Sequence, residues 1–291
     1  MNAIEAYASA TSVSPGDQLD LHVSMTPSGA FRVEVFRRGW EDGVIYSDSE
    51  WHNAGNHPLP SDASMNGCGW PIAYSLPIGA DWSSGVYVAR LTTDGGGITD
   101  LLFVMKAAAL GSNSKILFQI AVNTSQAYNN WVGRSLYSCN SVGENPASWV
   151  SFDRPGIEGH GSDEGGSDSP FSTYEYTFIR WLEKNGFEVE YCTSLDLHAN
   201  PDFLDNYQLL LSVGHDEYWS NAMRNNVEAF VANGGNFAIF GGNVCWWQVR
   251  FSDDLRRMTC YKSKDADPLT GTSNGEVTVF GGTTLFSDPA I

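Results

Sequence analysis

The hydrophobic pattern divides the chain into two parts that differ in period. Up to about Lys106, apolar and polar residues alternate in short runs, and turns rich in Pro and Gly separate these runs. The clearest runs are Gln18 to Ser24, Phe31 to Phe36, Gly85 to Leu91 and Leu101 to Met105. Because alternation buries one face of each strand, residues 1–108 are predicted to form an antiparallel, immunoglobulin-like β-sandwich.

Beyond a linker of small and polar residues at 107–114, apolar strands alternate with amphipathic helices. Strands are predicted at 116–122, 187–192, 208–213 and 236–240, and helices at 172–185 and 220–233. This alternation implies βαβ crossovers and a parallel sheet. We therefore expect a multidomain protein, all-β plus α/β, whose second domain (residues 109–291) has a flavodoxin-like, class I glutamine-amidotransferase-like fold. The chain ends without an obvious closing helix, so we expect this domain to be truncated at its C-terminus.

The composition is that of a globular protein and argues against several kinds of partner. With 34 Asp and Glu against 16 Lys and Arg, the formal net charge is -18, which disfavours binding to nucleic acid or to an anionic membrane surface. The five cysteines form no CxxC pair, so neither a disulfide framework nor a zinc cluster is indicated. No signal sequence or apolar run of membrane length is visible, and we expect a soluble cytoplasmic protein with reduced thiols.

The densest group of polar and aromatic residues is the segment 214–220, Gly-His-Asp-Glu-Tyr-Trp-Ser. It lies between a predicted buried strand and a helix that Ser220 would cap. Ligands of open α/β sheets bind outside the carboxyl ends of the strands, so His215 and Glu217 are candidate site residues. Each also has a structural interpretation. Glu217 could simply complement the helix N-terminus, and His215 could be a hydrogen-bonded structural histidine.

Three further segments reach the same edge of the predicted sheet. The first strand leads into a segment with Tyr128, and the last predicted strand leads into Asn243 after two glycines. The helix at 172–185 opens with the spacing of a capping box, which places Tyr174 in its first turn, facing inwards, and Tyr176 on another face. The tyrosines could equally be core aromatics, and Asn243 could be a turn residue.

Other chemistries have less support in the sequence. A cysteine-dependent, amidotransferase-like hydrolase needs its thiol at a sharp strand-to-helix turn with a histidine in reach. Cys245 is the only thiol close to the predicted sheet edge, and its neighbours Val244 and Trp246 indicate packing rather than exposure. The chain has no GxGxxG after the first strand and no Walker pattern, so nucleotide cofactors have no support.

At four places the sequence resembles the large (beta) subunit of N,N-dimethylformamidase and its relatives. These places are residues 124–131 (TSQAYNNW), 180–183 (RWLE), 214–220 (GHDEYWS) and 234–243, a stretch that begins and ends with GGN. The resemblance implies an amidohydrolase that holds one mononuclear iron ion, Fe³⁺, through two tyrosines and a glutamate. A histidine and an asparagine nearby would position the substrate.

The resemblance assigns roles to five residues of this chain. They are Tyr128, Tyr174 and Glu217 as iron ligands, and His215 and Asn243 as catalytic residues. Tyr137 and Tyr176 are the alternative tyrosine ligands. A further catalytic glutamate of the family would lie beyond Ile291. The resemblance also implies a small second subunit and an oligomeric assembly.

The resulting hypothesis is that an iron-activated water hydrolyses the C–N bond of a small amide such as N,N-dimethylformamide. Phenolates and a carboxylate are hard anionic ligands that suit trivalent iron. Iron would polarise the carbonyl, Asn243 would stabilise the oxyanion, and His215 would orient or shuttle a proton. The alternative is a non-catalytic module of the same fold that binds carbohydrate or another subunit.

Overall fold

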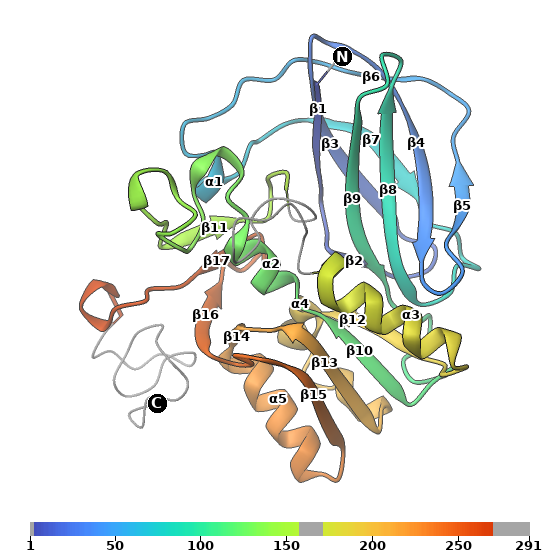
Figure 1. Ribbon diagram of the computed structural model, residues 1–291, viewed down its shortest axis with the longest axis vertical. Coiled ribbons are helices and arrows are strands. Elements are labelled where there is room, and N and C mark those ends of the chain that lie inside the picture. The colour runs from blue at the N-terminus through green and yellow to red at the C-terminus, as the bar shows by residue number, and fades with distance from the viewer. Residues whose placement is uncertain (1–2, 157–170, 270–291) are drawn as a thin grey trace.

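Two stacked β-sheets form the N-terminal part of the chain, here called the two-sheet region (residues 3–105; Figure 1). The computed structural model describes residues 3–156 and 171–269. One sheet has the order β1 (Ala3–Ala8), β3 (Gln18–Thr26), β7 (Ile72–Pro77). The other has the order β2 (Ser12–Val13), β9 (Ile98–Met105), β8 (Gly85–Thr93), β4 (Gly29–Arg38), β5 (Gly43–Ser47), with β6 (His52–Ala54) also paired to β4. Helix α1 (Ala63–Asn66) lies between β6 and β7.

Alternating side chains build the core between these two sheets. Leu19 and Leu21 of β3 and Phe31, Val33 and Val35 of β4 are all fully buried. Burying one such side chain stabilises the fold by about 1.5–3 kcal/mol, which explains why the two sheets pack face to face. The four predicted runs fall within β3, β4, β8 and β9, all of which have antiparallel partners. The immunoglobulin-like assignment stays a prediction.

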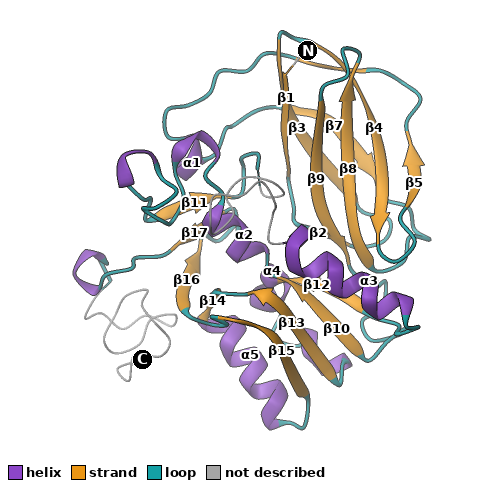
Figure 2. Ribbon diagram, viewed as in Figure 1, coloured by secondary structure: helices purple, strands orange, loops and turns teal. Residues whose placement is uncertain are grey.

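A four-stranded parallel sheet organises the second part, the α/β region (residues 116–269; Figure 2). Its order is β12 (Glu190–Thr193), β10 (Ile116–Ile120), β13 (Leu209–His215), β15 (Asn236–Gly242). Helix α3 (Tyr176–Lys184) packs on one face through Ile179, and α5 (Asn221–Ala232) packs on the other through Met223. The strands predicted from the sequence therefore pair in parallel, while the flavodoxin-like assignment stays a prediction.

Short elements after these strands complete the α/β region. A second sheet has the order β11 (Trp149–Ser151), β17 (Arg257–Thr259), β16 (Trp247–Phe251), β14 (Tyr218–Ser220). Helix α2 (Val122–Tyr128) follows β10, and α4 (Ser194–Ala199) follows β12. A π turn lies at Phe171–Glu175, and 3₁₀ turns lie at Trp131–Gly133, Val142–Glu144, Phe203–Asn206 and Lys264–Ala266. The π turn overlaps the start of the helix predicted at 172–185. The sequence pattern predicts none of the other elements in this group, because each is too short for a pattern that repeats clearly.

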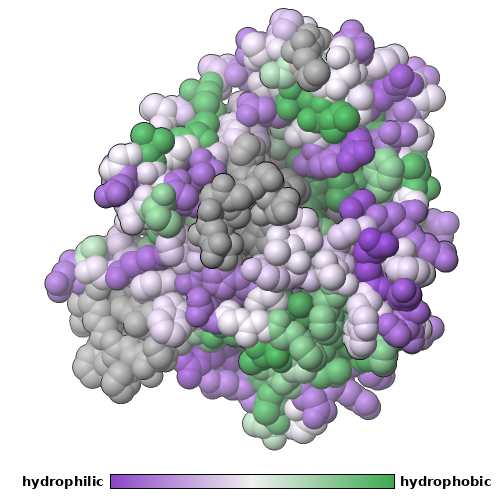
Figure 3. Space-filling model, in the orientation of Figure 1, coloured by the Kyte–Doolittle hydropathy of each residue, from purple (hydrophilic) through white to green (hydrophobic). Residues whose placement is uncertain are grey.

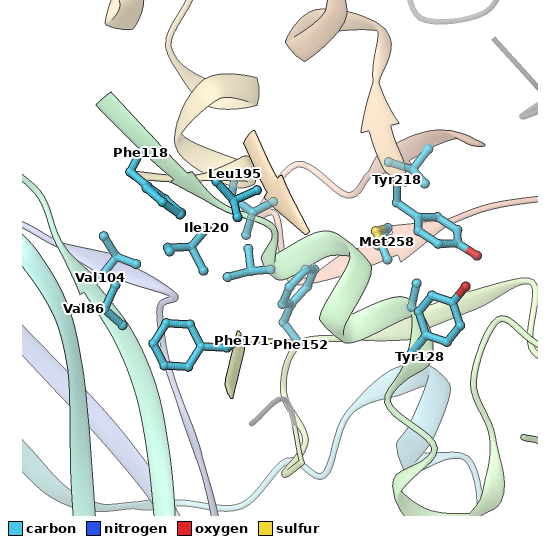
Figure 4. Close-up of a cluster of buried hydrophobic side chains, with 14 of the residues drawn as sticks. Val86, Val104, Phe118, Ile120, Tyr128, Phe152, Phe171, Leu195, Tyr218 and Met258 are labelled. Carbon is cyan, nitrogen blue, oxygen red and sulfur yellow. The ribbon is translucent and has the colours of Figure 1, made fainter. Parts of the chain in front are cut away.

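The two regions share a hydrophobic cluster, drawn in Figure 4, and they are also linked by an ion pair. Val86 of the two-sheet region packs in the same cluster as Phe118 of β10. Nearby, Arg37 Nη2 lies 2.7 Å from Glu183 Oε1, and Glu183 Oε2 accepts a hydrogen bond from the backbone N–H of Trp40 at 2.8 Å. The two regions are thus joined by packing and charge as well as by the chain. The predicted boundary between residues 108 and 109 stays a prediction.

Other expectations concern the cysteines, membrane spans and the chain end. The five cysteines are free thiols, and Cys68, Cys192 and Cys260 are buried. In the part of the chain that the structure describes, no helix is long and apolar enough to cross a membrane. The expected C-terminal truncation concerns residues 270–291, which lie outside the described residues.

Candidate active site

The chain turns sharply where β13 ends, and this turn carries the candidate residues. Gly214 has φ of 79°, a left-handed conformation that favours glycine, and a Cβ there would lie 2.6 Å from the Cβ of Tyr174. The following backbone is held from two sides. The N–H of Glu217 donates to Thr124 Oγ1 at 2.9 Å, and its carbonyl accepts from the N–H of Trp247 at 2.9 Å. The position of the Glu217 side chain is therefore set by α2 on one side and β16 on the other.

Two tyrosine hydroxyls converge on the Glu217 carboxylate. Tyr128, the last residue of α2, donates to Oε2 at 2.9 Å, and Tyr137 donates to Oε1 at 2.6 Å. The two rings stack with their centroids 4.2 Å apart. Because Tyr128 and Glu217 are only 6% and 4% exposed, the hydrogen bonds form away from bulk solvent.

An imidazole lies beside this carboxylate, and a side-chain amide lies beside the imidazole. His215 Nε2 is 3.2 Å from Glu217 Oε2 and 3.4 Å from Asn243 Nδ2. The structure thus brings together His215, Glu217 and Asn243, which the parallel-sheet argument places at one edge. The catalytic roles of His215 and Asn243 and the ligand role of Glu217 stay predictions. We refer to Tyr128, Tyr137, His215 and Glu217 as the Glu217 cluster.

A cavity of about 310 Å³ opens beside the Glu217 cluster, at the carboxyl ends of β13 and β15. Its lining consists of His215, Asn243, Tyr174 and Phe240, together with the glycines at the two strand ends. Ligand pockets commonly measure about 300–1,000 Å³, so this space suits a small molecule. His215 therefore contacts the buried carboxylate and also lines, together with Asn243, a space that a substrate could enter.

Burial and hydrogen bonding set the charges in the cluster. Burial raises the pKa of Glu217, but hydrogen bonds from His215 and the two tyrosines outweigh it and hold that pKa below its ordinary value. Burial, followed by the hydrogen bonds and the charge of Glu217, raises the pKa of Tyr128 and of Tyr137 well above the ordinary value. The cluster is thus an ionised carboxylate that accepts hydrogen bonds from two neutral phenols.

Two cations that the sequence pattern does not single out hold this arrangement. Arg154 is buried and donates to the carbonyl oxygens of Asn129 and Arg134, both at 2.9 Å, which closes the loop that separates the two tyrosines. Lys262 Nζ lies 3.1 Å from the ring centre of Tyr137, a cation–π contact, and burial lowers the pKa of this lysine to about 8. Both cations lie in irregular segments, where hydrophobic periodicity gives no signal.

Tyr174 lies against Gly214 at the cavity, as an inward-facing residue would, but it is not buried. Tyr174 is 44% exposed, whereas the adjacent Glu175 is buried and accepts a hydrogen bond from the N–H of Ala121 at 2.8 Å. The chain enters α3 through the π turn Phe171–Glu175 in place of the predicted capping box. Because of this turn, Glu175 and not Tyr174 is the buried residue at the start of α3. Burial raises the pKa of Glu175 to about 8.

Neither tyrosine at the start of α3 contacts the Glu217 carboxylate. Tyr174 lines the cavity, and the Tyr176 hydroxyl donates to Asp42 of the two-sheet region. The geometry therefore favours Tyr137, an alternative at the sequence level, as the second phenol beside Tyr128. The assignment of Tyr174 as a ligand stays a prediction that this geometry does not support.

The geometry gives no support to a catalytic thiol. Cys245 lines a separate, apolar cavity of about 610 Å³ together with Trp219 and Val227, and burial raises the pKa of its thiol to about 12. A thiol with such a pKa is a poor nucleophile at neutral pH. Within residues 3–156 and 171–269, no three His, Cys, Asp or Glu side chains are grouped to hold a metal ion. A metal at the Glu217 cluster would therefore depend on the two phenols.

Two relatives share part of this sequence. The N,N-dimethylformamidase beta subunits of Alcaligenes sp and Paracoccus aminophilus are each 35% identical to this chain over 74 residues. Those residues make up 24% of this chain but only 9% of either relative. The matched part is thus a small fraction of the relatives' length.

Solved structures resemble the chain only weakly. The sporulation control protein Spo0M from Bacillus subtilis has a TM-score of 0.24 at 9% identity, over 38% of this chain and 50% of that protein. A superoxide reductase (neelaredoxin) from Ignicoccus hospitalis has a TM-score of 0.20 at 12% identity, over 36% of this chain and 79% of that protein. Similarity at this level supports no conclusion about fold or function.

A comparison with protein families covers far more of the chain. Residues 32–290 match the family described as "N,N-dimethylformamidase beta subunit-like, C-terminal". The match includes the strands of the two-sheet region from β4 onwards and the whole Glu217 cluster. The chain therefore belongs to the N,N-dimethylformamidase beta subunit-like family.

Proposed function

We propose that this chain hydrolyses the C–N bond of a small amide such as N,N-dimethylformamide at the Glu217 cluster. The observation that carries the proposal is the convergence of two phenols and an imidazole on one buried carboxylate, beside a cavity of about 310 Å³. Membership of the family, and the name of both relatives, support amide hydrolysis over other chemistry. The reaction consumes one water and releases a carboxylic acid and an amine.

The proposal includes one ferric ion held by Tyr128, Tyr137 and Glu217. Phenolate and carboxylate oxygens are hard anionic donors, which suit a trivalent cation. Each phenol proton lies in a hydrogen bond to the carboxylate, so loss of both protons would leave anionic oxygens facing one another, an arrangement that a cation would stabilise. The donor set therefore fits iron. When bound, iron would supply Lewis-acid polarisation of the amide carbonyl and a more acidic water.

The residues beside the carboxylate would orient the amide and move the proton. Asn243 Nδ2 is a hydrogen-bond donor at the cavity and would stabilise the negative charge that develops on the carbonyl oxygen. His215 also lines the cavity, where it would accept a proton from the attacking water. The same imidazole would return that proton to the amine nitrogen as the C–N bond breaks.

The proposal extends to assembly. Both relatives are named as the beta subunit of an enzyme. We therefore propose that this chain also associates with a second, smaller subunit and forms an oligomer. Size-exclusion chromatography of the chain alone and co-purified with its partner would measure this association.

Iron content, visible absorption and turnover test the proposed reaction together. The wild-type protein is expected to contain stoichiometric iron, to absorb visible light through tyrosinate-to-iron charge transfer, and to release dimethylamine from N,N-dimethylformamide. E217Q removes the carboxylate charge and is expected to lower iron content roughly tenfold or more and kcat/KM about 1,000-fold, since a catalytic metal contributes several kcal/mol.

Asp48 of the two-sheet region provides a matched control. Its Oδ2 also accepts a hydrogen bond from a tyrosine hydroxyl, that of Tyr74, at 2.8 Å, and lies 2.9 Å from His52 Nε2. D48N is expected to leave iron content and turnover at wild-type values. A colourless wild-type protein that binds no added ferric iron would contradict the iron site. An iron-loaded protein that releases no amine would contradict the hydrolase activity.

A further inference from the structure

The cavity beside the Glu217 cluster is lined by both polar and apolar side chains. His215 and Asn243 are polar lining residues, and Phe240, which is 53% exposed, is an apolar one. Figure 3 shows apolar side chains gathered over the part of the α/β region where β13 and β15 lie. We propose that Gly242, which lines the same cavity, sets the size of the alkyl groups that the site accepts on an amide. This role rests on the proposed amide hydrolysis.

Strand geometry places a side chain at Gly242 on the sheet face of two other residues that line the cavity, His215 and Phe240. Gly242 pairs with His215 across β15 and β13, and paired residues of parallel strands point to the same face of a sheet. Residues two apart in a strand also share a face, so a Cβ at Gly242 would lie on the side of Phe240. Apart from its chain neighbours, no heavy atom lies within 4 Å of that Cβ. An added methyl group would therefore occupy open cavity space without a clash.

The neighbouring glycines are required for other reasons. A Cβ at Gly241 would lie 1.7 Å from the carbonyl oxygen of Gly214, so Gly241 allows β13 and β15 to approach each other. Gly214 itself has φ of 79° and lies against Tyr174. Gly242 has neither constraint, because its backbone lies outside the left-handed region and its Cβ would be free of contacts. Its role in the site is thus the space that it leaves.

This space indicates the class of amide. The carbonyl group would bind to the polar side chains of His215 and Asn243, which leaves the nitrogen substituents near Gly242 and Phe240. A tertiary amide carries two alkyl groups on its nitrogen, and a wall without a side chain accommodates both. The site is therefore suited to formamides with two short N-alkyl groups.

A size series of amides measures the role of Gly242. N-methylformamide, N,N-dimethylformamide and N,N-diethylformamide are titrated by ligand-observed NMR against the full chain as wild type and as G242A. The alanine methyl group reduces the room for the largest amide, so the Kd of the diethyl compound should rise about tenfold relative to that of N-methylformamide. G43A is the matched control, because a Cβ at Gly43 of β5 also meets no atom within 4 Å. It should change none of the three values.

The outcomes separate this role from the proposed reaction. A change of Kd that is equal for all three amides, or no change at all, would overturn the role of Gly242 in size selection. Amine release is measured for the same series. If the wild-type protein binds the amides without releasing amine, hydrolysis is refuted, while the size dependence of Kd still decides the role of Gly242. If the wild-type protein binds no amide, both proposals fail.

Discussion

Two clusters in this molecule contain the same residue types, yet only one is built like an active site. In the two-sheet region, the Asp48 cluster consists of Tyr46, Asp48, His52 and Tyr74. In the α/β region, the Glu217 cluster consists of Tyr128, Tyr137, His215 and Glu217. Each cluster has two phenols, one imidazole and one carboxylate, so composition alone does not distinguish them.

The two clusters differ in how their hydrogen bonds connect. In the Asp48 cluster the phenols form a chain, because the Tyr46 hydroxyl lies 2.7 Å from that of Tyr74, which donates to Asp48 at 2.8 Å. In the Glu217 cluster both phenols reach the carboxylate directly. Asp48 is also partly exposed, whereas Glu217 is buried. A cation could therefore replace two phenol protons beside Glu217 but only one beside Asp48.

The position of each carboxylate in the fold explains the difference. Asp48 follows β5, an edge strand of the two-sheet region. Glu217 follows β13, an interior strand of the parallel sheet, close to the end of α2 and to β15. The carboxyl ends of parallel strands bring distant segments together, so donors can approach one carboxylate from several sides.

The largest expected difference between the two clusters is in the effect of removing one phenol hydroxyl from each. Y137F removes a proposed iron donor and is expected to lower iron affinity and kcat/KM by about 100-fold or more. This loss corresponds to a part of the several kcal/mol by which a catalytic metal stabilises the transition state. Y74F removes a hydroxyl of the same type and is expected to lower the free energy of unfolding by about 1 kcal/mol, with turnover unchanged. Iron titration and amine release measure the first effect, and urea unfolding measures the second.

Y174F decides between the two possible second phenols. Tyr174 is 44% exposed and does not contact Glu217, so Y174F is expected to retain both iron and the visible absorption band. Loss of iron in Y174F, with iron retained in Y137F, would return the ligand role to Tyr174. The comparison of the two clusters would then no longer explain the site.

The residues at the strand ends are predictable, and the second phenol is not. His215 and Asn243 each follow a short, mostly apolar run that predicts a buried strand, and the parallel-sheet rule brings the ends of these strands to one edge. Tyr137 lies in a loop that the buried Arg154 closes through backbone carbonyl groups. Such contacts leave no period in the sequence, so helix spacing favours Tyr174, which the π turn then places partly in solvent.

In the fold, too, local sequence patterns predict some elements and miss others. The long alternating runs predict β3, β4, β8 and β9, because one buried face is enough to define each strand. The strand predicted from Phe187 begins only at Glu190, because Phe187 stacks on Trp181 after α3 ends. Tyr218 of β14 pairs with Trp247 of β16, far along the chain, and a local pattern does not reveal such a partner.

An intermediate effect is expected at the ion pair that joins the two regions. Burial raises the pKa of Glu183, but Arg37 and the N–H of Trp40 outweigh it and hold that pKa below its ordinary value. E183Q is expected to lower the free energy of unfolding by about 2 kcal/mol. This value lies between the loss that is typical when an exposed ion pair is broken and the larger loss when a buried one is broken. D100N is the control, because Asp100 pairs with Arg90 at 2.7 Å in a more exposed place and should cost less than about 1 kcal/mol. Calorimetry would also show whether the two regions then unfold separately.

The same carboxylate predicts a specific acid sensitivity. The folded pKa of Glu183 lies below the ordinary value of 4.5, so its contribution to stability is complete above that pH and is lost as the pH falls towards the folded pKa. Between about pH 5 and about pH 3, the wild-type protein should therefore lose more stability than E183Q. Equal losses would show that Glu183 does not couple the two regions through its charge.

The smallest expected effect lies at the outer end of the Asp48 cluster. Y46F removes the hydroxyl that lies 2.7 Å from Tyr74, while Tyr74 keeps its bond to Asp48, so we expect a loss of only about 0.5–1 kcal/mol and no change in amine release. If the hydrogen bonds run in series, Y46F should cost nothing further in a Y74F background, whereas converging bonds would give additive losses. Urea unfolding of both single variants and the double variant measures this. Additive losses would mean that the Asp48 cluster is built like the Glu217 cluster, and connectivity would then no longer explain why only one of them is a candidate site.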